Sequence, residues 1–97
     1  MLIGFEWDPA KAKANVRKHG VSFDEACTSF DDPLSQTIDD PDHSEDESRF
    51  VTLGRSKQGN LLVVCHCDRT DHIRIISVRP ANRRERKRYE DANLGCQ

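Results

Sequence analysis

The stretch VRPANRRERKRYE, residues 78–90, holds the side chains of this sequence that are best suited to phosphate chemistry. It contains six Arg or Lys residues, although the whole chain has a formal net charge of −2. Arginine presents a planar set of N–H donors that matches phosphate oxygens. The same cation stabilises the negative charge that develops when a phosphodiester is cleaved. The stretch therefore indicates a nucleic-acid-binding or active-site element.

The alternative is a terminal helix whose charges only face solvent. Asn82, with Glu85 three positions later, forms a capping box, so we expect a helix over 81–92. Arg83 and Arg84 then fall in the first turn, where the helix dipole favours acids. Helix stability alone does not account for arginines at these positions. Arginine donors at a helix N-terminus do suit a phosphate group, which favours a functional role.

Arginines also interrupt the apolar strands that the sequence predicts. Alternation along residues 72–79 gives one face with Ile73, Ile75, Ser77 and Arg79, and another with His72, Arg74, Ile76 and Val78. Arg55 likewise shares a face with Val51 and Leu53. An arginine among core residues is costly unless it is paired or lies on a concave surface. We expect Arg79, at the strand end, to lie at the mouth of a cleft. The alternative for these arginines is an apolar stem whose guanidinium reaches a surface acid.

If the ligand of this basic stretch is RNA, its cleavage without a metal requires three groups. A base assists deprotonation of the 2′-hydroxyl, a cation stabilises the phosphorane-like charge, and an acid protonates the leaving 5′-oxygen. Arg79 is the candidate cation, and the candidates for proton transfer are His19, Glu85 and Tyr89. The RNA-binding candidates are Arg55, Arg74, Arg83 and Arg86. For His19 the alternative is a histidine that the helix dipole favours at a helix C-terminus.

The N-terminal part of the chain predicts a strand followed by two helices. A strand over 3–8 places Ile3, Phe5 and Trp7 on one side. Asp8 and Pro9 begin a helix that ends at Gly20. Its inward residues are expected to be Ala10, Ala14 and Val16. Ser22 and Glu25 form a capping box for the second helix. The core residues of that helix are expected to be Phe23, Ala26, Cys27 and Phe30.

The remainder of the chain predicts an acidic loop and an antiparallel meander. Residues 31–47 contain eight acids and no Lys or Arg, and we expect a loop with a short edge strand at 35–38. Strands at 49–56, 61–67 and 72–79 are joined by short turns. The apolar run at the start of the central strand predicts burial on both faces. Together the elements predict a single α+β domain over 1–97, a small antiparallel sheet with helices packed on one face.

Several classes of protein are not supported. No apolar run approaches the roughly 20 residues of a transmembrane helix, and the chain does not start with a signal peptide. We therefore expect a cytoplasmic protein without membrane contact. There is no CxxC pair, and adjacent strand residues such as Cys65 and His66 face opposite ways, so we expect no metal and no cofactor. Cys65 and Cys67 are expected to be small, buried, reduced residues.

The net charge conceals two opposed halves. Residues 1–48 hold four Lys or Arg against twelve Asp or Glu, whereas residues 49–97 hold eleven against five. This asymmetry indicates a positive face with a purpose and a negative segment that covers it or keeps it selective.

Three stretches taken together resemble the BrnT family of bacterial toxins. They are FEWDPAKAKANVRKHGVSFDEA, DPDHSEDESRFVTLGRS and IRIISVRPANRRERKRYE, which span about residues 5–90. The combination of a WD start, N-x3-KHG-x2-F, E-x-R before TLG and SxRPAxxxERxxY is fairly specific. The polar positions that match the family's pattern are His19, Arg49, Arg79, Glu85, Arg86 and Tyr89. On this ground Arg49 joins the RNA-binding candidates.

The resemblance implies a RelE-like fold and a type II toxin that acts as a metal-independent ribonuclease and inhibits translation. It also implies a BrnA-like antitoxin with a ribbon-helix-helix DNA-binding domain, so that operator DNA is reached only through the antitoxin. The acidic loop at 39–47 is then expected to modulate RNA access or to contact the antitoxin. A second candidate function is a non-catalytic toxin-like partner that acts as a co-repressor. A third is a structural domain, which would show no salt-dependent affinity for RNA.

Overall fold

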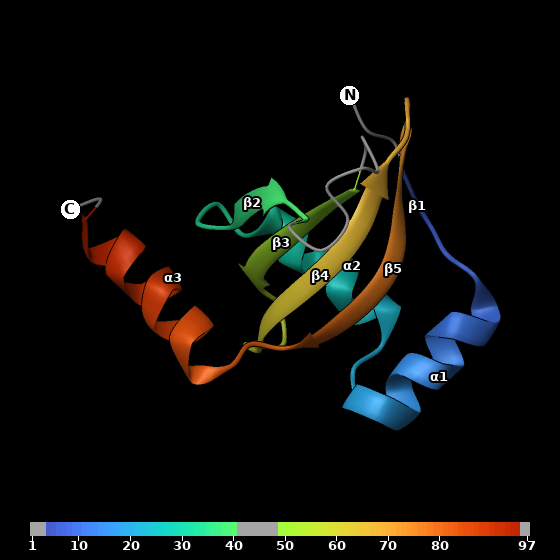
Figure 1. Ribbon diagram of the computed structural model, residues 1–97, viewed down its shortest axis with the longest axis horizontal. Coiled ribbons are helices and arrows are strands. Elements are labelled where there is room, and N and C mark those ends of the chain that lie inside the picture. Colours follow the sequence, from blue (N-terminus) through green and yellow to red (C-terminus); the bar gives the residue numbers. More distant parts are fainter. Residues whose placement is uncertain (1–3, 41–48, 96–97) are drawn as a thin grey trace.

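The computed structural model describes residues 4–40 and 49–95 of the chain (Figure 1). Its elements are β1 (Gly4–Glu6), α1 (Pro9–His19), α2 (Phe23–Thr28), the short 3-10 helix η1 (Ser29–Asp31), β2 (Gln36–Asp39), β3 (Arg49–Arg55), β4 (Leu61–Asp68), β5 (His72–Pro80) and α3 (Arg83–Gly95). The expected element order is confirmed over these residues. Ile3 and residues 41–48, which include most of the acidic loop predicted at 39–47, lie outside the described part of the chain.

The five strands form one sheet in the order β1-β5-β4-β3-β2. β3, β4 and β5 form the expected antiparallel meander, and β2 pairs antiparallel with β3 at the edge. β1 pairs with β5 in parallel, since α1 and α2 intervene between β1 and the rest of the sheet. The α+β class is therefore confirmed, but the sheet is mixed and not wholly antiparallel. Leu61 to Val64 of the central strand are buried, as expected.

The ends of α1 follow the local signals in the sequence. Asp8 Oδ1 accepts from the Ala10 N–H at 2.8 Å, and Gly20 takes the left-handed conformation with φ 73° while its N–H donates to the Val16 carbonyl. For α2, Ser22 Oγ accepts from the Glu25 N–H at 3.0 Å. The Glu25 carboxylate binds elsewhere, so only half of this expected capping box forms.

The inward face of α1 differs from the expectation. Ala10, Ala14 and Val16 are exposed, and Asn15 is the buried residue of this helix. The Asn15 amide donates to the carbonyls of Val21 and Val78, and its Oδ1 accepts from the Val78 N–H. Three alanines and one valine provide too little apolar surface to fix the rotation of the helix. Hydrogen bonds to β5 fix it in their place.

Two apolar clusters lie on opposite faces of the sheet. The cluster beneath α1 and α2 consists of Val21, Phe23, Ala26, Leu62, Val64, Ile73, Ile75 and Val78. The smaller cluster on the other face consists of Leu53, Leu61, Val63 and Tyr89. Because Tyr89 belongs to α3, this helix does not share the face that α1 and α2 cover. Figure 1 shows α3 (red) apart from α1 (blue), at the other end of the molecule.

A β-bulge changes which side chains of β5 share a face. Cys65 pairs with Ser77 and His66 with Ile75, so Ile76 is the extra residue opposite this step. Ile73, Ile75 and Val78 therefore all enter the cluster beneath the helices. Arg79 pairs with Val63 on the other face. The expected grouping of Arg79 with Ile73 and Ile75 is wrong, because strict alternation does not survive a bulge.

Two further observations bear on the expected class of protein. None of the helices in the described part of the chain combines the length and the apolar character needed to cross a membrane. Cys27, Cys65 and Cys67 carry free thiols, and all three are half-buried, whereas Cys65 and Cys67 were expected to be buried.

Candidate nucleic-acid interface

The strand arginines gather on the sheet face opposite α1 and α2, which we call the arginine face. Residues directly opposite each other on neighbouring strands point to the same face. Cys67 of β4 lies between Arg49 of β3 and Arg74 of β5 in this register. Val63, whose side chain belongs to the α3-side cluster, lies in register with Arg79. Arg55 lies two positions from Leu53 on the same strand and therefore points to the same face, near Tyr89. Its predicted sharing of a face with Val51 and Leu53 is thus confirmed.

Arg79 and Glu85 form a two-fold ion pair at the junction of β5 and α3. Arg79 Nη1 lies 2.8 Å from Glu85 Oε1, and Nη2 lies 2.7 Å from Oε2. Glu85 Oε1 also accepts from the Asn82 N–H, while Asn82 Oδ1 accepts from the Glu85 N–H, both at 2.8 Å. The predicted capping box of α3 is thus confirmed. It fixes the carboxylate against the arginine at the end of the strand.

This pairing shifts the titration of both partners. The hydrogen bonds from Arg79 lower the pKa of the Glu85 carboxyl below its ordinary value, although partial burial opposes the shift. The hydrogen bonds to Glu85 raise the pKa of the Arg79 guanidinium. Both side chains are therefore charged at neutral pH. The Arg79 side chain remains 41% exposed, so it can still reach a ligand.

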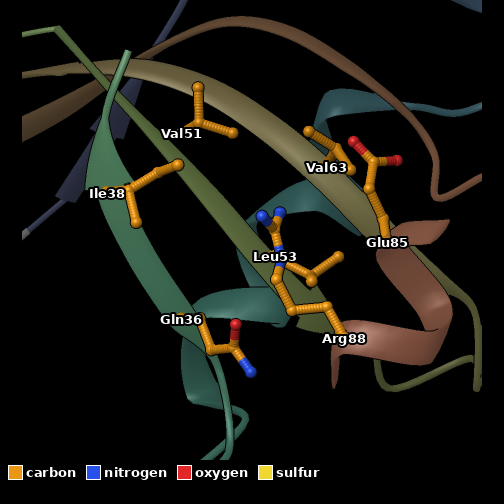
Figure 2. A pocket seen from close by; sticks show the side chains of 7 residues that line it. All are labelled: Gln36, Ile38, Val51, Leu53, Val63, Glu85 and Arg88. Atoms are coloured by element: carbon orange, nitrogen blue, oxygen red, sulfur yellow. The ribbon is translucent and has the colours of Figure 1, made fainter. Parts of the chain in front are cut away.

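A hollow of about 90 Å³ opens on the arginine face beside this pair, and we call it the Arg88 hollow. It is lined by Gln36, Ile38, Val51, Leu53, Val63, Glu85 and Arg88 (Figure 2). Figure 2 shows the Arg88 side chain extending from α3 into the hollow, near Leu53. The floor is apolar and the charged groups lie at the rim. Arg88 was not among the site candidates named from the sequence, although it follows Glu85 by three positions and that spacing places it on the same side of the helix.

Tyr89 attaches α3 to the sheet. Its side chain is 3% exposed, and its hydroxyl donates to Asp32 Oδ2. The Arg55 guanidinium lies 5.5 Å from the centre of the Tyr89 ring and donates to the Gly59 carbonyl at 3.0 Å. Burial raises the pKa of the Tyr89 hydroxyl. These contacts make Tyr89 a structural anchor in the free protein, while its role in proton transfer stays a prediction.

The far end of the arginine face contains a second ion pair. Arg74 Nη1 donates to Glu6 Oε2 at 2.7 Å, and both side chains are more than a third exposed. A phosphate group bound there would compete with Glu6 for the guanidinium. Arg49 is half-buried on β3, and β4 lies between it and Arg74.

Two further sequence candidates, His19 and Arg86, line a different hollow, of about 310 Å³, which we call the His19 hollow. Its lining residues are His19, Gly20, Val21, Glu25, Gly59, Asn60, Leu61, Leu62, Pro80 and Arg86. Glu25 Oε2 accepts from Ser56 Oγ at 2.8 Å and from Asn60 Nδ2 at 2.7 Å. The structure thus separates His19 and Arg86 from Arg79 and Glu85. Sequence reasoning treated Glu25 only as a capping residue and missed its place in this hollow.

Arg83 lies exposed on α3 and lines neither hollow. Across residues 4–40 and 49–95, no three His, Cys, Asp or Glu side chains are grouped so as to hold a metal ion. Among the described residues, the arginine face therefore offers guanidinium cations, the paired carboxylates of Glu85 and Glu6, and a small apolar hollow.

The sequence pattern of a known family identifies what kind of protein carries this face. A model of the ribonuclease toxin BrnT of type II toxin–antitoxin systems matches residues 7–85. The chain belongs to the BrnT family. The resemblance noted from its motifs is confirmed, and with it the general class of ribonuclease toxin. A search of curated proteins found no significant match.

A solved structure supports the fold. The 1.1 Å crystal structure of the Brucella abortus ribonuclease toxin BrnT matches with a TM-score of 0.66 and 18% sequence identity. The match covers 84% of this chain and 99% of the Brucella chain. The architecture of this BrnT-family chain is therefore shared with that toxin.

Proposed function

We propose that this BrnT-family chain is a metal-independent endoribonuclease that binds RNA across the arginine face and thereby inhibits translation in the cytoplasm. One observation carries the proposal. Arginines from two different strands and from the β5–α3 junction, separated in the sequence, lie on one sheet face with the Arg79–Glu85 pair at its end. Cationic side chains that share a face with apolar residues suit a polyanion whose bases need a surface.

Arg79 and Glu85 are the proposed catalytic residues. When a phosphodiester binds, one of its oxygens accepts a hydrogen bond from an N–H of Arg79, and this weakens the ion pair between Arg79 and Glu85. The freed carboxylate accepts the proton of the 2′-hydroxyl, whose oxygen attacks phosphorus. The bond from phosphorus to the 5′-oxygen breaks, and water protonates this leaving oxygen. The hydroxide that results takes the proton from Glu85, which restores the carboxylate. The products are a 2′,3′-cyclic phosphate and a 5′-hydroxyl. Arg79 stabilises the negative charge of the phosphorane-like transition state that precedes them.

The remaining arginines hold the RNA backbone. Arg49, Arg55 and Arg74 lie on the arginine face and bind phosphates on either side of the cleaved bond. Arg83 and Arg86 extend this positive surface along α3, toward the His19 hollow. The affinity for RNA should then fall steeply as salt rises, because each neutralised phosphate releases counterions.

Regulation follows from the toxin–antitoxin class. A type II toxin has an antitoxin partner, and we propose that it is a BrnA-like protein with a ribbon-helix-helix domain. Operator DNA is bound by that domain and reaches the toxin only through the complex. Covering the arginine face is the simplest way for such a partner to prevent RNA cleavage.

The test is a cleavage assay with purified, antitoxin-free protein and RNA in the presence of EDTA. Wild type should cleave with EDTA present, and Arg79→Ala should reduce the rate by about 10²–10³, the usual cost of losing one charge-stabilising donor. Arg84→Ala is the matched control, because it removes an equal charge from an exposed position of α3 that lines neither hollow. Absence of cleavage by folded wild type would refute the ribonuclease proposal and favour a co-repressor.

A further inference from the structure

The strand β2 forms one edge of the sheet, and its outer side is open. The sheet order ends at β2, so residues 4–40 and 49–95 supply no strand beyond it. The Asp40 N–H donates to the Arg49 carbonyl at 3.1 Å, which makes these two residues a hydrogen-bonded pair of the ladder. Because such pairs alternate with non-hydrogen-bonded ones, the backbone groups of Thr37 and Asp39 face outward. An open edge of this kind can pair with a strand of another chain.

The same edge exposes apolar surface. Leu34, two positions before β2, is 43% exposed, and Ile38, within β2, is 50% exposed. At the opposite edge of the sheet, Phe5 of β1 packs against Phe30, with ring centres 5.4 Å apart. Exposed apolar side chains that lie beside a hollow indicate an interaction surface.

The Arg88 hollow lies directly beside this edge. Ile38 forms part of its apolar floor, together with Val51 and Leu53 of β3 and Val63 of β4. At about 90 Å³, the hollow suits a single side chain and not a packed helix. Arg88 extends into it from α3 and makes the rim cationic (Figure 2). A strand added to β2 points every second side chain toward this face, so the surface fits an apolar residue with an acidic residue two positions away.

We propose that an extended segment of the antitoxin adds to the outer edge of β2 and places one large aliphatic side chain in the Arg88 hollow and one acidic side chain against Arg88. The partner follows from the type II toxin–antitoxin class of the family. Its charge follows from the arginine face, whose cations attract an acidic segment as they attract RNA. Main-chain hydrogen bonds to Thr37 and Asp39 hold the segment, and the hollow selects its sequence.

Occupation of the hollow keeps RNA away from the proposed catalytic pair. Glu85 lines the hollow and is bound to Arg79. A side chain seated there lies beside both groups, and its neighbours cover arginines that the RNA backbone uses. This consequence rests on the proposed function, whereas the docking rests on the toxin–antitoxin class and on the geometry of β2.

The first test measures the affinity of the full chain for the purified antitoxin encoded by the neighbouring gene, by isothermal titration calorimetry. Ile38→Asp puts a charge into the apolar floor and should weaken binding about 30-fold or more, as the loss of a central interface contact does. Val16→Asp is the matched control, because Val16 is 48% exposed on α1, on the other side of the sheet. Its affinity should stay within about twofold of wild type.

The charge of the segment is tested in the same way. Arg88→Gln removes the cation at the rim of the hollow and should weaken binding about tenfold. Arg84→Gln removes an equal charge from an exposed position of α3 that lines neither hollow and should change the affinity less than about twofold.

Amide hydrogen exchange tests the strand pairing. The amides of Thr37 and Asp39 should exchange at least about tenfold more slowly in the complex than in the free protein. Asp39→Pro removes an N–H that faces outward, so the fold should be retained while antitoxin binding weakens about tenfold. Asp39→Ala keeps this N–H and should stay within about twofold of wild type. If Asp39→Pro does not fold, the exchange rates of wild type decide.

Several results would overturn the inference. They are a wild type that does not bind the antitoxin, an affinity that is unchanged in Ile38→Asp or in Arg88→Gln, and amides of Thr37 and Asp39 that exchange equally fast in the complex. The proposed function fails separately, since none of these measurements contains RNA. A wild type that cleaves no RNA but binds the antitoxin through β2 refutes the proposed catalysis and supports the docking site. A wild type that cleaves RNA but binds the antitoxin elsewhere does the reverse.

Discussion

The two hollows border the same first turns of α3, yet they differ in size, lining and chemistry. Glu85 lines the Arg88 hollow, and Arg86, the next residue, lines the His19 hollow. The His19 hollow is larger and contains an imidazole, a carboxylate and a guanidinium. The Arg88 hollow is smaller, but it lies on the face that carries the strand arginines. Size and polarity favour the His19 hollow as the substrate site, whereas the field of the surrounding charges favours the Arg88 hollow.

We expect the location of charge to matter more than the volume of a pocket for a polyanionic substrate. RNA needs several cations along a surface, and the affinity grows with each phosphate that is neutralised. Arg86 is the one cationic arginine among the residues that line the His19 hollow, and Glu25 lies in the same lining. The arginine face carries more arginines, and it also has the carboxylate of Glu85, which is paired with Arg79. Substitutions in the two regions should therefore have different effects on RNA cleavage.

The largest effect is expected from Glu85→Gln. The amide keeps an oxygen that can accept from the Asn82 N–H, so α3 should remain capped, but it cannot take the proton of a 2′-hydroxyl. Cleavage should fall by about 10²–10⁴, the usual contribution of a general base. A single-turnover assay with saturating enzyme measures it. A loss of less than about threefold would move the base out of the arginine face.

Arg79→Lys should have an intermediate effect. Lysine keeps the positive charge but lacks the planar fork that engages both oxygens of Glu85. Losing one charge-assisted hydrogen bond should lower the cleavage rate roughly tenfold. Full activity of this variant would show that only charge matters at the junction, and the same substitution at Arg84 serves as its control.

Tyr89→Phe should act on stability more than on cleavage. The substitution keeps the ring in the apolar cluster and removes the hydrogen bond to Asp32. The free energy of unfolding should fall by about 1 kcal/mol in urea denaturation, while the cleavage rate of the folded variant stays within about threefold of wild type. A hundredfold loss of cleavage with little loss of stability would assign Tyr89 to proton transfer after all.

The buried His66 should make the stability of the fold depend on pH, and this limits the pH range in which cleavage by variants of the two regions can be compared. His66 is 2% exposed beneath the sheet, with Nδ1 2.8 Å from Asp68 and Nε2 2.7 Å from Thr52 Oγ1. Burial lowers its pKa in the folded protein, so the unfolded chain binds the proton more readily. Stability should therefore decline as pH falls below about 6.5, the ordinary histidine value.

The measurement that checks this is the midpoint of thermal unfolding as a function of pH. His66→Gln should weaken its pH dependence around that value. An unchanged slope in this variant would assign the acid sensitivity to other groups. Cleavage assays should be compared only at pH values where the fold is intact.

Local signals in the sequence predicted the elements of the fold well, because caps and turns depend on neighbouring residues. Asp8, Gly20 and the Asn82–Glu85 box all act as their types and spacing indicate. The rotation of α1 could not be predicted in the same way. It depends on Asn15 reaching Val78, a contact between residues 63 positions apart.

The site was predicted in its residue types and less well in its geometry. Alternation placed Arg79 at a strand end correctly, but the bulge at Ile76 reversed its face relative to Ile73. The division of the candidates between two hollows depends on how α3 leaves the sheet.

The most direct test of the account compares Arg79→Ala with His19→Ala in one single-turnover RNA cleavage assay containing EDTA. Both variants should fold, which circular dichroism checks, and each removes one key group from one of the two regions. The cleavage rate should fall by about 10²–10³ in Arg79→Ala and by less than about threefold in His19→Ala. The opposite ranking would refute catalysis by the Arg79–Glu85 pair and place the chemistry in the His19 hollow.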